Sequence, residues 1–261
     1  MKRFSIPFYL LLSVFFICSS CFADQQGFHS IPSRDGVEQP LWLIEPDNAS
    51  HCVILFAGGK GKLNIDDSGI GDEGNFLVRT RHQFADQGMV VAVVDTPTDK
   101  DKMFRFRKTK KHARDIKAVI SFLRQRHPGK PVWLVGTSRG TISAANAAAR
   151  LQGQDGPDGI VLTSSVTRKS KKGLDSLEDI DLSAITVPTY VVHHEKDECG
   201  VTPYDKAQEL LGQLSSVKVK EFKGVSGGQA KGNPCKGKSY HGFLGIEKQV
   251  VNSIVSWIKT H

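Results

Sequence analysis

The chain has 261 residues, of which 39% are apolar and 24% are charged, so it is long enough to bury a full core and does not have the composition of a low-complexity chain. Its formal net charge is +8, but the basic residues are spread over several segments and are not interleaved with aromatic residues. This pattern does not indicate a nucleic-acid-binding protein, and the basic clusters at 105–111 and 168–172 are interpreted as solvated loops and helix faces.

The first 23 residues predict a secretory signal peptide. A basic start precedes a mostly apolar stretch at 6–17, and small residues allow cleavage after Ala23. The mature chain is then periplasmic or secreted and has no stable membrane insertion. A membrane anchor and a lipoprotein modified at Cys21 stay open as alternatives, although the apolar stretch is shorter than the roughly 20 residues that span a bilayer. Cys18 also stands where a lipid-modified Cys21 would normally have a larger aliphatic residue.

Strand and helix patterns alternate along the rest of the chain. Apolar or alternating runs predict strands at 41–44, 52–57, 89–95, 131–135, 159–163, 188–192 and 217–222. Helical patterns lie at 76–85, 116–123, 141–151, 203–214 and 246–258. This βαβ series predicts an α/β fold, a mostly parallel sheet with helices on both faces, formed by a single domain from 24 to 261.

Residues 136–140, Gly-Thr-Ser-Arg-Gly, have the form of a nucleophile elbow, a sharp turn that presents a serine between a strand and a helix. The glycines are needed because side chains two residues before and after the serine would collide across the turn. The apolar run before this pentapeptide and the small-residue helix after it are the setting that the motif requires. Ser138 is therefore the candidate nucleophile, and a purely structural turn is the alternative.

A serine nucleophile needs a base and a carboxylate that orients the base. Asp197 follows the predicted strand at 188–192 and is the candidate acid, with Glu195 and Asp205 as rivals. His241 lies between the last predicted strand and the closing helix, where a returning loop can carry an imidazole over the elbow. The chain order Ser138, Asp197, His241 supports this assignment.

Backbone N–H groups are the expected donors to an oxyanion, one from the residue after the serine and one from a loop after an earlier strand. Arg139 fits the first position. Gly58 and Gly59, which follow the predicted strand at 52–57, fit the second. A flexible glycine-rich turn is the alternative interpretation of the second loop, and no Walker pattern follows it.

From about Leu41 to its end, the chain resembles the α/β-hydrolase superfamily. The resemblance implies esterase, lipase, thioesterase or peptidase chemistry through an acyl-serine, with no metal and no cofactor. The chain departs from the common pattern because it lacks a His-Gly pair at the oxyanion loop and has only a short segment, 166–184, where a lid domain would lie. These departures favour small, soluble acyl substrates in an open cleft.

Three cysteines remain after signal cleavage. Cys199 and Cys235 both lie in predicted loops, and in an oxidising compartment we expect them to form a disulfide. Cys52 opens a predicted buried strand and is expected to remain a free, buried thiol.

Two classes of function follow from these patterns. The first is an exported serine hydrolase that acts on a small-molecule ester, and the second is a non-catalytic ligand-binding or interaction protein on the same scaffold. Lys60, Lys62 and Arg139 lie in or beside the two oxyanion loops, so a substrate that carries negative charge is a further hypothesis. The sequence leaves the acyl and alcohol groups of the substrate and the oligomeric state open.

Overall fold

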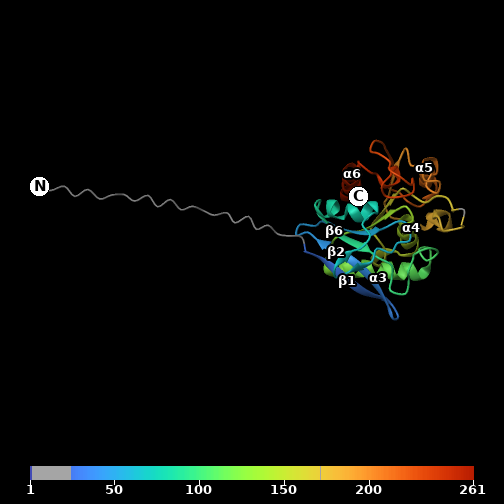
Figure 1. The fold of residues 1–261 in the computed structure, drawn as a ribbon. Coiled ribbons are helices and arrows are strands. Elements are labelled where there is room, and N and C mark those ends of the chain that lie inside the picture. Colours follow the sequence, from blue (N-terminus) through green and yellow to red (C-terminus); the bar gives the residue numbers. More distant parts are fainter. Residues whose placement is uncertain (2–24, 171) are drawn as a thin grey trace.

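An eight-stranded sheet forms the centre of the molecule (Figure 1). The computed structural model describes residues 1, 25–170 and 172–261, so the predicted signal peptide and its cleavage site lie outside the described residues, apart from Met1. The strand order is β1-β2-β6-β3-β7-β8-β9-β10. The bounds are β1 Gln25–Arg34, β2 Val37–Glu45, β3 His51–Phe56, β6 Met89–Val94, β7 Val132–Thr137, β8 Gly159–Thr163, β9 Thr189–His194 and β10 Lys220–Val225. A separate small hairpin consists of β4 Ile65–Asp66 and β5 Gly69–Ile70.

Six α-helices accompany the sheet in the described part of the chain. They are α1 Phe76–Arg79, α2 Arg81–Ala85, α3 Lys110–Arg126, α4 Gly140–Arg150, α5 Tyr204–Gln213 and α6 Glu247–Thr260. Within these described ranges, none of the helices combines the length and the apolar character needed to cross a membrane.

The helices cover both faces of the sheet and bury two separate cores. Successive side chains of a strand point to opposite faces, so in β3 Cys52, Ile54 and Phe56 enter one core while Val53 and Leu55 enter the other. The first core also receives the apolar faces of α3, α4 and α5, and the second receives α1, α2 and α6. The two-faced burial explains why the central strands are continuous apolar runs.

The predicted mostly parallel sheet with helices on both faces is confirmed. From β6 to β10 the neighbouring strands all pair in parallel, whereas β1 and β2 form an antiparallel hairpin that joins β6. The sequence patterns predict only 41–44 of this hairpin. They do not indicate β1, because all but one residue of that edge strand are exposed or half-buried and it contains Pro32, so it has neither an apolar run nor a clean alternation.

Two further boundaries differ from the sequence prediction. The helix expected at 76–85 divides at Thr80, whose φ of −102° and ψ of 5° depart from helical values. The hydroxyl of Thr80 donates to the carbonyl of Phe76 at 2.8 Å, beside the regular bond from its own amide at 3.1 Å. The alternating strand expected at 217–222 begins later, at Lys220, where it pairs in parallel with β9.

The parallel strands place several loops at one edge of the sheet. Because β3, β6, β7, β8, β9 and β10 run in the same direction, their carboxyl ends meet there. The loops that follow β3, β7 and β9 carry Gly58, Ser138 and Asp197, and the segment after β10 carries His241. All the candidate site residues therefore come from this edge.

Candidate active site

Ser138 stands at the turn between β7 and α4 with a strained backbone. Its φ of 53° lies in the left-handed region, which residues other than glycine rarely adopt. The amide of Ser138 donates to the carbonyl of Thr163 at 2.9 Å, and its carbonyl accepts from the hydroxyl of Thr141 at 2.6 Å. The first turn of α4 and the end of β8 thus hold the serine in this conformation.

The two glycines of the pentapeptide are required by close contacts. A side chain on Gly136 would come within 2.5 Å of the carbonyl oxygen of Gly140, and one on Gly140 would overlap the carbonyl oxygen of Phe56. The sequence analysis predicted this crowding across the turn. The strand, the sharp turn and the helix together form the local geometry of a nucleophile elbow.

The structure brings His241 and Asp197 together. Nδ1 of His241 lies 2.8 Å from Oδ2 of Asp197, and both side chains are buried. In this arrangement Nδ1–H donates to the carboxylate, which leaves Nε2 free to accept a proton. The rival carboxylates Glu195 and Asp205 are exposed, and neither is hydrogen-bonded to His241 among the described residues.

Asp197 is held as a buried carboxylate by several donors. Its Oδ1 accepts from the amide of Cys199 at 3.0 Å, and its Oδ2 also accepts from the hydroxyl of Thr202 at 3.0 Å. Nε2 of His193 is 3.3 Å from the same oxygen. Burial alone would raise the pKa of Asp197, but hydrogen bonds from His193 and His241 outweigh burial and lower that pKa well below its ordinary range. Asp197 is therefore ionised at neutral pH.

The backbone around His241 is tied to α1 and to the residue that follows β8. His241 lies in the 3-10 turn η4 (Tyr240–Gly242), and its carbonyl accepts from the hydroxyl of Ser164 at 2.8 Å. The carbonyl of Gly242 accepts from the guanidinium of Arg79 on α1 at 2.5 Å. Phe243, which is fully buried, packs edge to face on Phe76 with ring centroids 4.9 Å apart. These contacts fix the turn that carries the imidazole.

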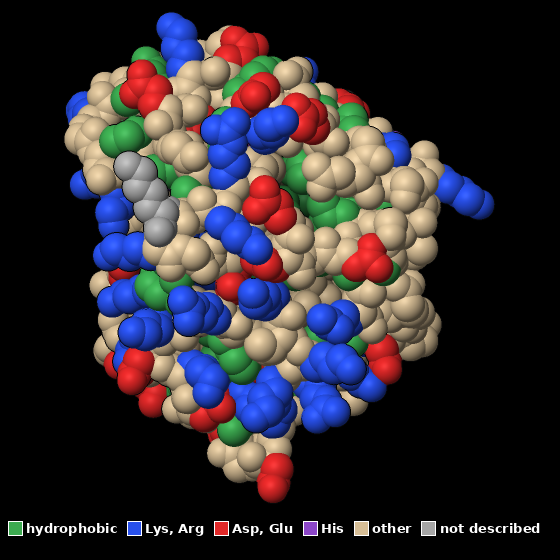
Figure 2. Space-filling view, turned by 90° about the vertical axis from the view of Figure 1, so that its right-hand side faces the viewer, with side chains coloured by type: hydrophobic (Ala, Val, Ile, Leu, Met, Phe, Trp, Pro, Cys, Tyr) green, Lys and Arg blue, Asp and Glu red, His purple; other side chains and the backbone are tan. Residues whose placement is uncertain are grey.

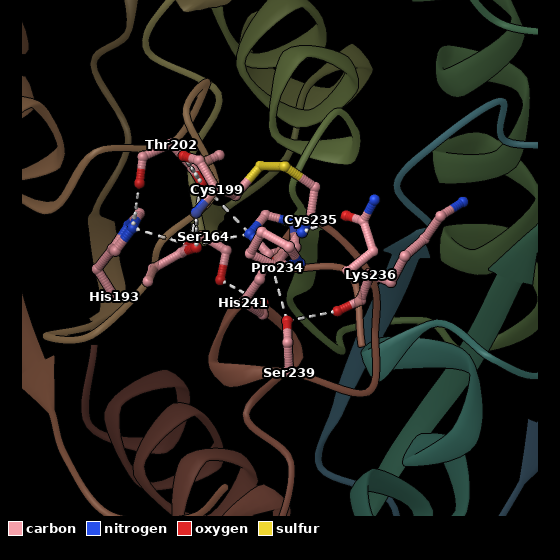
Figure 3. The surroundings of a disulfide bond; sticks show 11 residues. Ser164, His193, Cys199, Thr202, Pro234, Cys235, Lys236, Ser239 and His241 are labelled. Carbon is pink, nitrogen blue, oxygen red and sulfur yellow. Dashed lines mark hydrogen bonds and ion pairs between the residues drawn. A yellow bond between two sulfur atoms is a disulfide. The ribbon is translucent and has the colours of Figure 1, made fainter. Parts of the chain in front are cut away.

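A disulfide joins the segments that carry Asp197 and His241. Cys199 and Cys235 are bonded, with their Cα atoms 4.7 Å apart, and Cys52 is a free, buried cysteine. Figure 3 shows His241 beside the bridge, with Thr202 and His193 to its left. Both of these residues contact Oδ2 of Asp197. The hydroxyl of Ser239 donates to the carbonyls of Pro234 and Lys236, each at 2.8 Å, and this closes the loop next to the bridge.

Gly58 and Arg139 flank the serine on its two sides. A side chain on Gly58 would come within 2.9 Å of Cβ of Ser138, so the loop after β3 lies directly against the elbow. Gly59 follows with a φ of 58°, and Arg139 begins the turn into α4. Of the predicted oxyanion residues, Gly58 is thus a neighbour of Ser138 in space and Arg139 is its neighbour in sequence.

Arg107 supports the loop after β3 and was misinterpreted from sequence as part of a solvated basic cluster. The side chain is buried, and it donates to the carbonyl of Ala57 at 2.9 Å and to the hydroxyl of Ser143 on α4 at 2.7 Å. Burial, together with repulsion from Arg139, lowers the pKa of Arg107 to about 9, so the group is still a cation at neutral pH. Nothing in the local sequence distinguishes Arg107 from its solvated basic neighbours.

Asp95, at the end of β6, organises the same loop from the other side. Its carboxylate accepts from the amides of Leu63 at 2.7 Å, Ile65 at 2.8 Å and Thr96 at 2.7 Å. The loop between β3 and β4 is therefore held by buried polar groups at both of its ends. An aspartate directly after the apolar run at 89–94 is the one signal in the sequence that could have drawn attention to this role.

Ser138 and His241 are close through their neighbours but are not hydrogen-bonded to each other in the described part of the chain. The serine amide is bonded to Thr163, and the next residue, Ser164, is bonded to the His241 carbonyl. Catalytic hydrogen bonds of this kind are often long in the absence of substrate. Within the described residues, neither the serine hydroxyl nor Nε2 of His241 is buried without a partner, so both reach open space.

Comparisons with known proteins agree with this architecture. A family model described as Serine aminopeptidase, S33 matches residues 68–180, and the comparison with curated protein sequences found no match. A cold-adapted esterase from an Arctic intertidal metagenomic library is 16% identical with a TM-score of 0.60, and the alignment covers 90% of this chain and 94% of that one. A Pyrococcus furiosus esterase is 13% identical with a TM-score of 0.65, and 91% and 93% of the two chains are covered. A dienelactone hydrolase from Anabaena variabilis is 13% identical with a TM-score of 0.64, and 91% and 98% are covered.

At these identities the solved structures show a shared fold, and they share it over nearly the whole of the described chain. That fold combines a mostly parallel sheet with a sharp turn after a central strand. It also places an acid and a histidine on later loops, as Asp197 and His241 are placed here. The chain has the α/β-hydrolase fold, and its residues 68–180 match the family model described as Serine aminopeptidase, S33.

Proposed function

We propose that the protein is a serine hydrolase that cleaves a small, soluble carboxylic ester or thioester through an acyl-serine intermediate. The observation that carries the proposal is the buried hydrogen bond between His241 and Asp197 on loops adjoining the elbow of Ser138. A binding protein without turnover would not require an ionised buried carboxylate aimed at an imidazole.

Each group has a role in the proposed reaction. Nε2 of His241 takes the proton of Ser138 as the serine oxygen attacks the carbonyl carbon, and Asp197 stabilises the resulting imidazolium. The backbone amides of Arg139 and of Gly58 or Gly59 donate to the oxyanion. Collapse of the tetrahedral intermediate breaks the ester bond, and the alcohol leaves with the proton from His241. Water then attacks the acyl-serine by the same route and releases the acid.

We also propose that the preferred substrate carries negative charge near its acyl group. Arg139 is partly buried over the ring of Phe104, 5.5 Å from its centroid, and donates to the backbone carbonyl of Asp175 at 2.9 Å. The carboxylate of Asp175 is 3.1 Å from Lys108, so it is already paired with another cation. Arg139, one position after the proposed nucleophile in the chain, therefore carries a positive charge with no carboxylate bonded to it among the described residues.

The positive residues that the sequence analysis named do not contribute equally to this proposal. Lys62 is 3.2 Å from Asp101, which balances its charge, and Lys60 is exposed. Figure 2 shows the face on the right-hand side of Figure 1, where Lys and Arg side chains gather across the lower part with few acidic side chains among them. Such an excess of positive charge attracts anions to this face of the molecule.

Export remains part of the proposal. The basic, then apolar, then small-residue pattern of residues 1–23 supports cleavage after Ala23, and a disulfide between the acid and base loops suits an oxidising compartment. The mass and N-terminal sequence of protein recovered from the periplasm or medium test it. A mature chain that begins at Asp24 is expected, whereas a lipid-bearing Cys21 would identify the lipoprotein alternative.

A comparison of the parent with a Ser138→Ala variant, by probe labelling and by ester turnover, tests the proposed chemistry. The parent should react with a fluorophosphonate probe and hydrolyse members of an ester panel, and Ser138→Ala should lose both while its melting temperature stays close to that of the parent. Ser170→Ala, in the loop after β8, is the matched serine control and should keep both. A Ser138→Ala variant with more than about a hundredth of the parental kcat would exclude Ser138 as the nucleophile.

A further inference from the structure

The side chain of Asn75 has two ends, and only one of them is used by the fold. Asn75 precedes α1 as its N-cap, and its Oδ1 accepts from the amide of Leu77 at 3.1 Å. An N–H group can be capped only by the oxygen of the side-chain amide, so this bond determines which way the group faces. The NH2 end must therefore point away from the helix.

The NH2 end of Asn75 lies near the proposed nucleophile. A side-chain carbon on Gly58 would lie 3.4 Å from Nδ2 of Asn75 and 2.9 Å from Cβ of Ser138. The amide and the serine thus border the same small volume, which is free because residue 58 has no side chain. The loop after β3, which is expected to supply an oxyanion donor, borders this volume.

The Nδ2 donor has no protein acceptor among the described residues. Asn75 is partly buried, but Nδ2 itself is accessible, so it reaches the open space near Ser138. A serine, threonine or aspartate would cap the helix equally well. The NH2 group is therefore surplus to the capping role and available to a ligand.

Neighbouring contacts hold Asn75 rigidly. Nη1 of Arg79 donates to the carbonyl of Gly74 at 3.2 Å, while Nη2 of the same side chain donates to the carbonyl of Gly242. The residue before Asn75 is thus fixed through one guanidinium to the turn that carries His241. A donor held in this way needs no reorganisation when charge develops in front of it.

We propose that Nδ2 of Asn75 donates a hydrogen bond to the carbonyl oxygen of the substrate as it becomes an oxyanion, together with the backbone amides of the oxyanion loops. The inference rests on the proposed function. Because the oxygen gains negative charge in the transition state, the bond is stronger there than in the bound ester. Its loss should lower kcat more than it raises KM.

Two substitutions that keep the helix cap separate the proposed role from a structural one. Asn75→Ser retains a capping oxygen and has no amide, and Asn75→Asp retains the cap but turns an anionic oxygen toward the oxyanion. We expect Asn75→Ser to lower kcat for a neutral ester roughly 10- to 100-fold with little change in KM or melting temperature. Asn75→Asp should lower kcat further, because its charge repels the oxyanion.

An inhibitor provides a readout that a lost cap would not move. A trifluoromethyl ketone that forms a tetrahedral adduct with the enzyme should bind Asn75→Ser more weakly by about the same factor as kcat falls. Asn75→Ala, which removes the cap and the donor, measures the stability effect of capping alone through its melting temperature.

The outcomes distinguish this inference from the proposed function. If turnover depends on Ser138 but Asn75→Ser keeps parental kcat and inhibitor affinity, the role of Asn75 is wrong and the hydrolase proposal stands. If Asn75→Ser loses activity only in proportion to a fall in melting temperature, Asn75 is a cap and nothing more. If Ser138→Ala keeps the parental turnover, both proposals are wrong.

Discussion

His112 is a buried imidazole that the proposed reaction does not use. It packs against Phe56 and Phe106, and neither of its ring nitrogens has a hydrogen-bond partner among the described residues. Burial, with the nearby charges of Arg107 and Arg34, lowers the pKa of His112 to about 3. The folded protein therefore keeps this ring neutral at pH values where the unfolded chain would protonate it.

This difference predicts a loss of stability in acid. Between about pH 6.5, the ordinary pKa of histidine, and about pH 3, the unfolded chain binds one proton more at His112 than the folded protein. The contribution of the neutral His112 ring to the unfolding free energy is complete above pH 6.5. It falls by about 1.4 kcal/mol for each pH unit below that value. Urea titrations of the parent and His112→Phe between pH 4 and pH 7 measure the effect.

His112→Phe should show a shallower decline of the unfolding free energy over this range. Replacement of His82, which is exposed on α2, by Phe serves as the control and should leave the slope unchanged. Equal slopes for the parent and His112→Phe would mean that the ring is protonated or hydrogen-bonded in the folded protein.

At the scale of elements, the disulfide connects the turn after β9 to the long segment between β10 and η4. Residues 226–239 contain no helix or strand and are mostly exposed, so few buried contacts hold this segment in place. The bridge closes a loop with a sequence separation of 36 residues, which stabilises such a loop by roughly 3 to 4 kcal/mol on chain-entropy grounds. The sheet and helices do not depend on the segment for their cores.

Reduction should therefore lower activity before it unfolds the protein. We expect Cys199→Ser/Cys235→Ser, or the parent in dithiothreitol, to lose ester turnover at temperatures where circular dichroism still reports the folded state. Mass spectrometry of alkylated protein shows whether Cys199 and Cys235 are bonded. Burial raises the pKa of Cys52 to about 12, so that thiol stays unreactive until the protein is denatured. Two free thiols at Cys199 and Cys235 in exported protein, or loss of activity only together with unfolding, would contradict the prediction.

At the scale of the whole molecule, the charge distribution bears on substrate choice. The parent should have a higher kcat/KM for an anionic ester than for a neutral ester of matched size at low salt. The preference should shrink as salt shortens the screening length to about 8 Å at physiological ionic strength. Steady-state kinetics at two ionic strengths measure both effects.

A pair of variants locates the charge that matters. Arg139→Gln should reduce the preference for the anionic ester, whereas Lys62→Gln should leave it nearly unchanged because Lys62 is already paired with Asp101. A parent that shows no preference at low salt and no additional loss at high salt would exclude an anion-attracting cleft.

Most of the fold was predictable because its strands are continuous apolar runs. The strands around Val53, Val91 and Val135 are buried on both faces, so composition alone identifies them. The first strand was not predictable because it lies at an edge with exposed residues, and the division at Thr80 is a change in the backbone angles of a single residue. Local patterns do not encode either feature.

The sequence by itself determined the α/β architecture, the strained turn at Ser138 and the candidates Asp197 and His241, because these depend on local periodicity, on glycine and on chain order. Only the tertiary structure decided that Asp197 rather than Glu195 contacts His241. It also decided that Arg107 is buried against the loop after β3 and that Asn75 lies near Ser138. The physical reason is that parallel strands bring together loops far apart in sequence, and hydrogen bonds formed across that edge leave no trace in the spacing of the residues that make them.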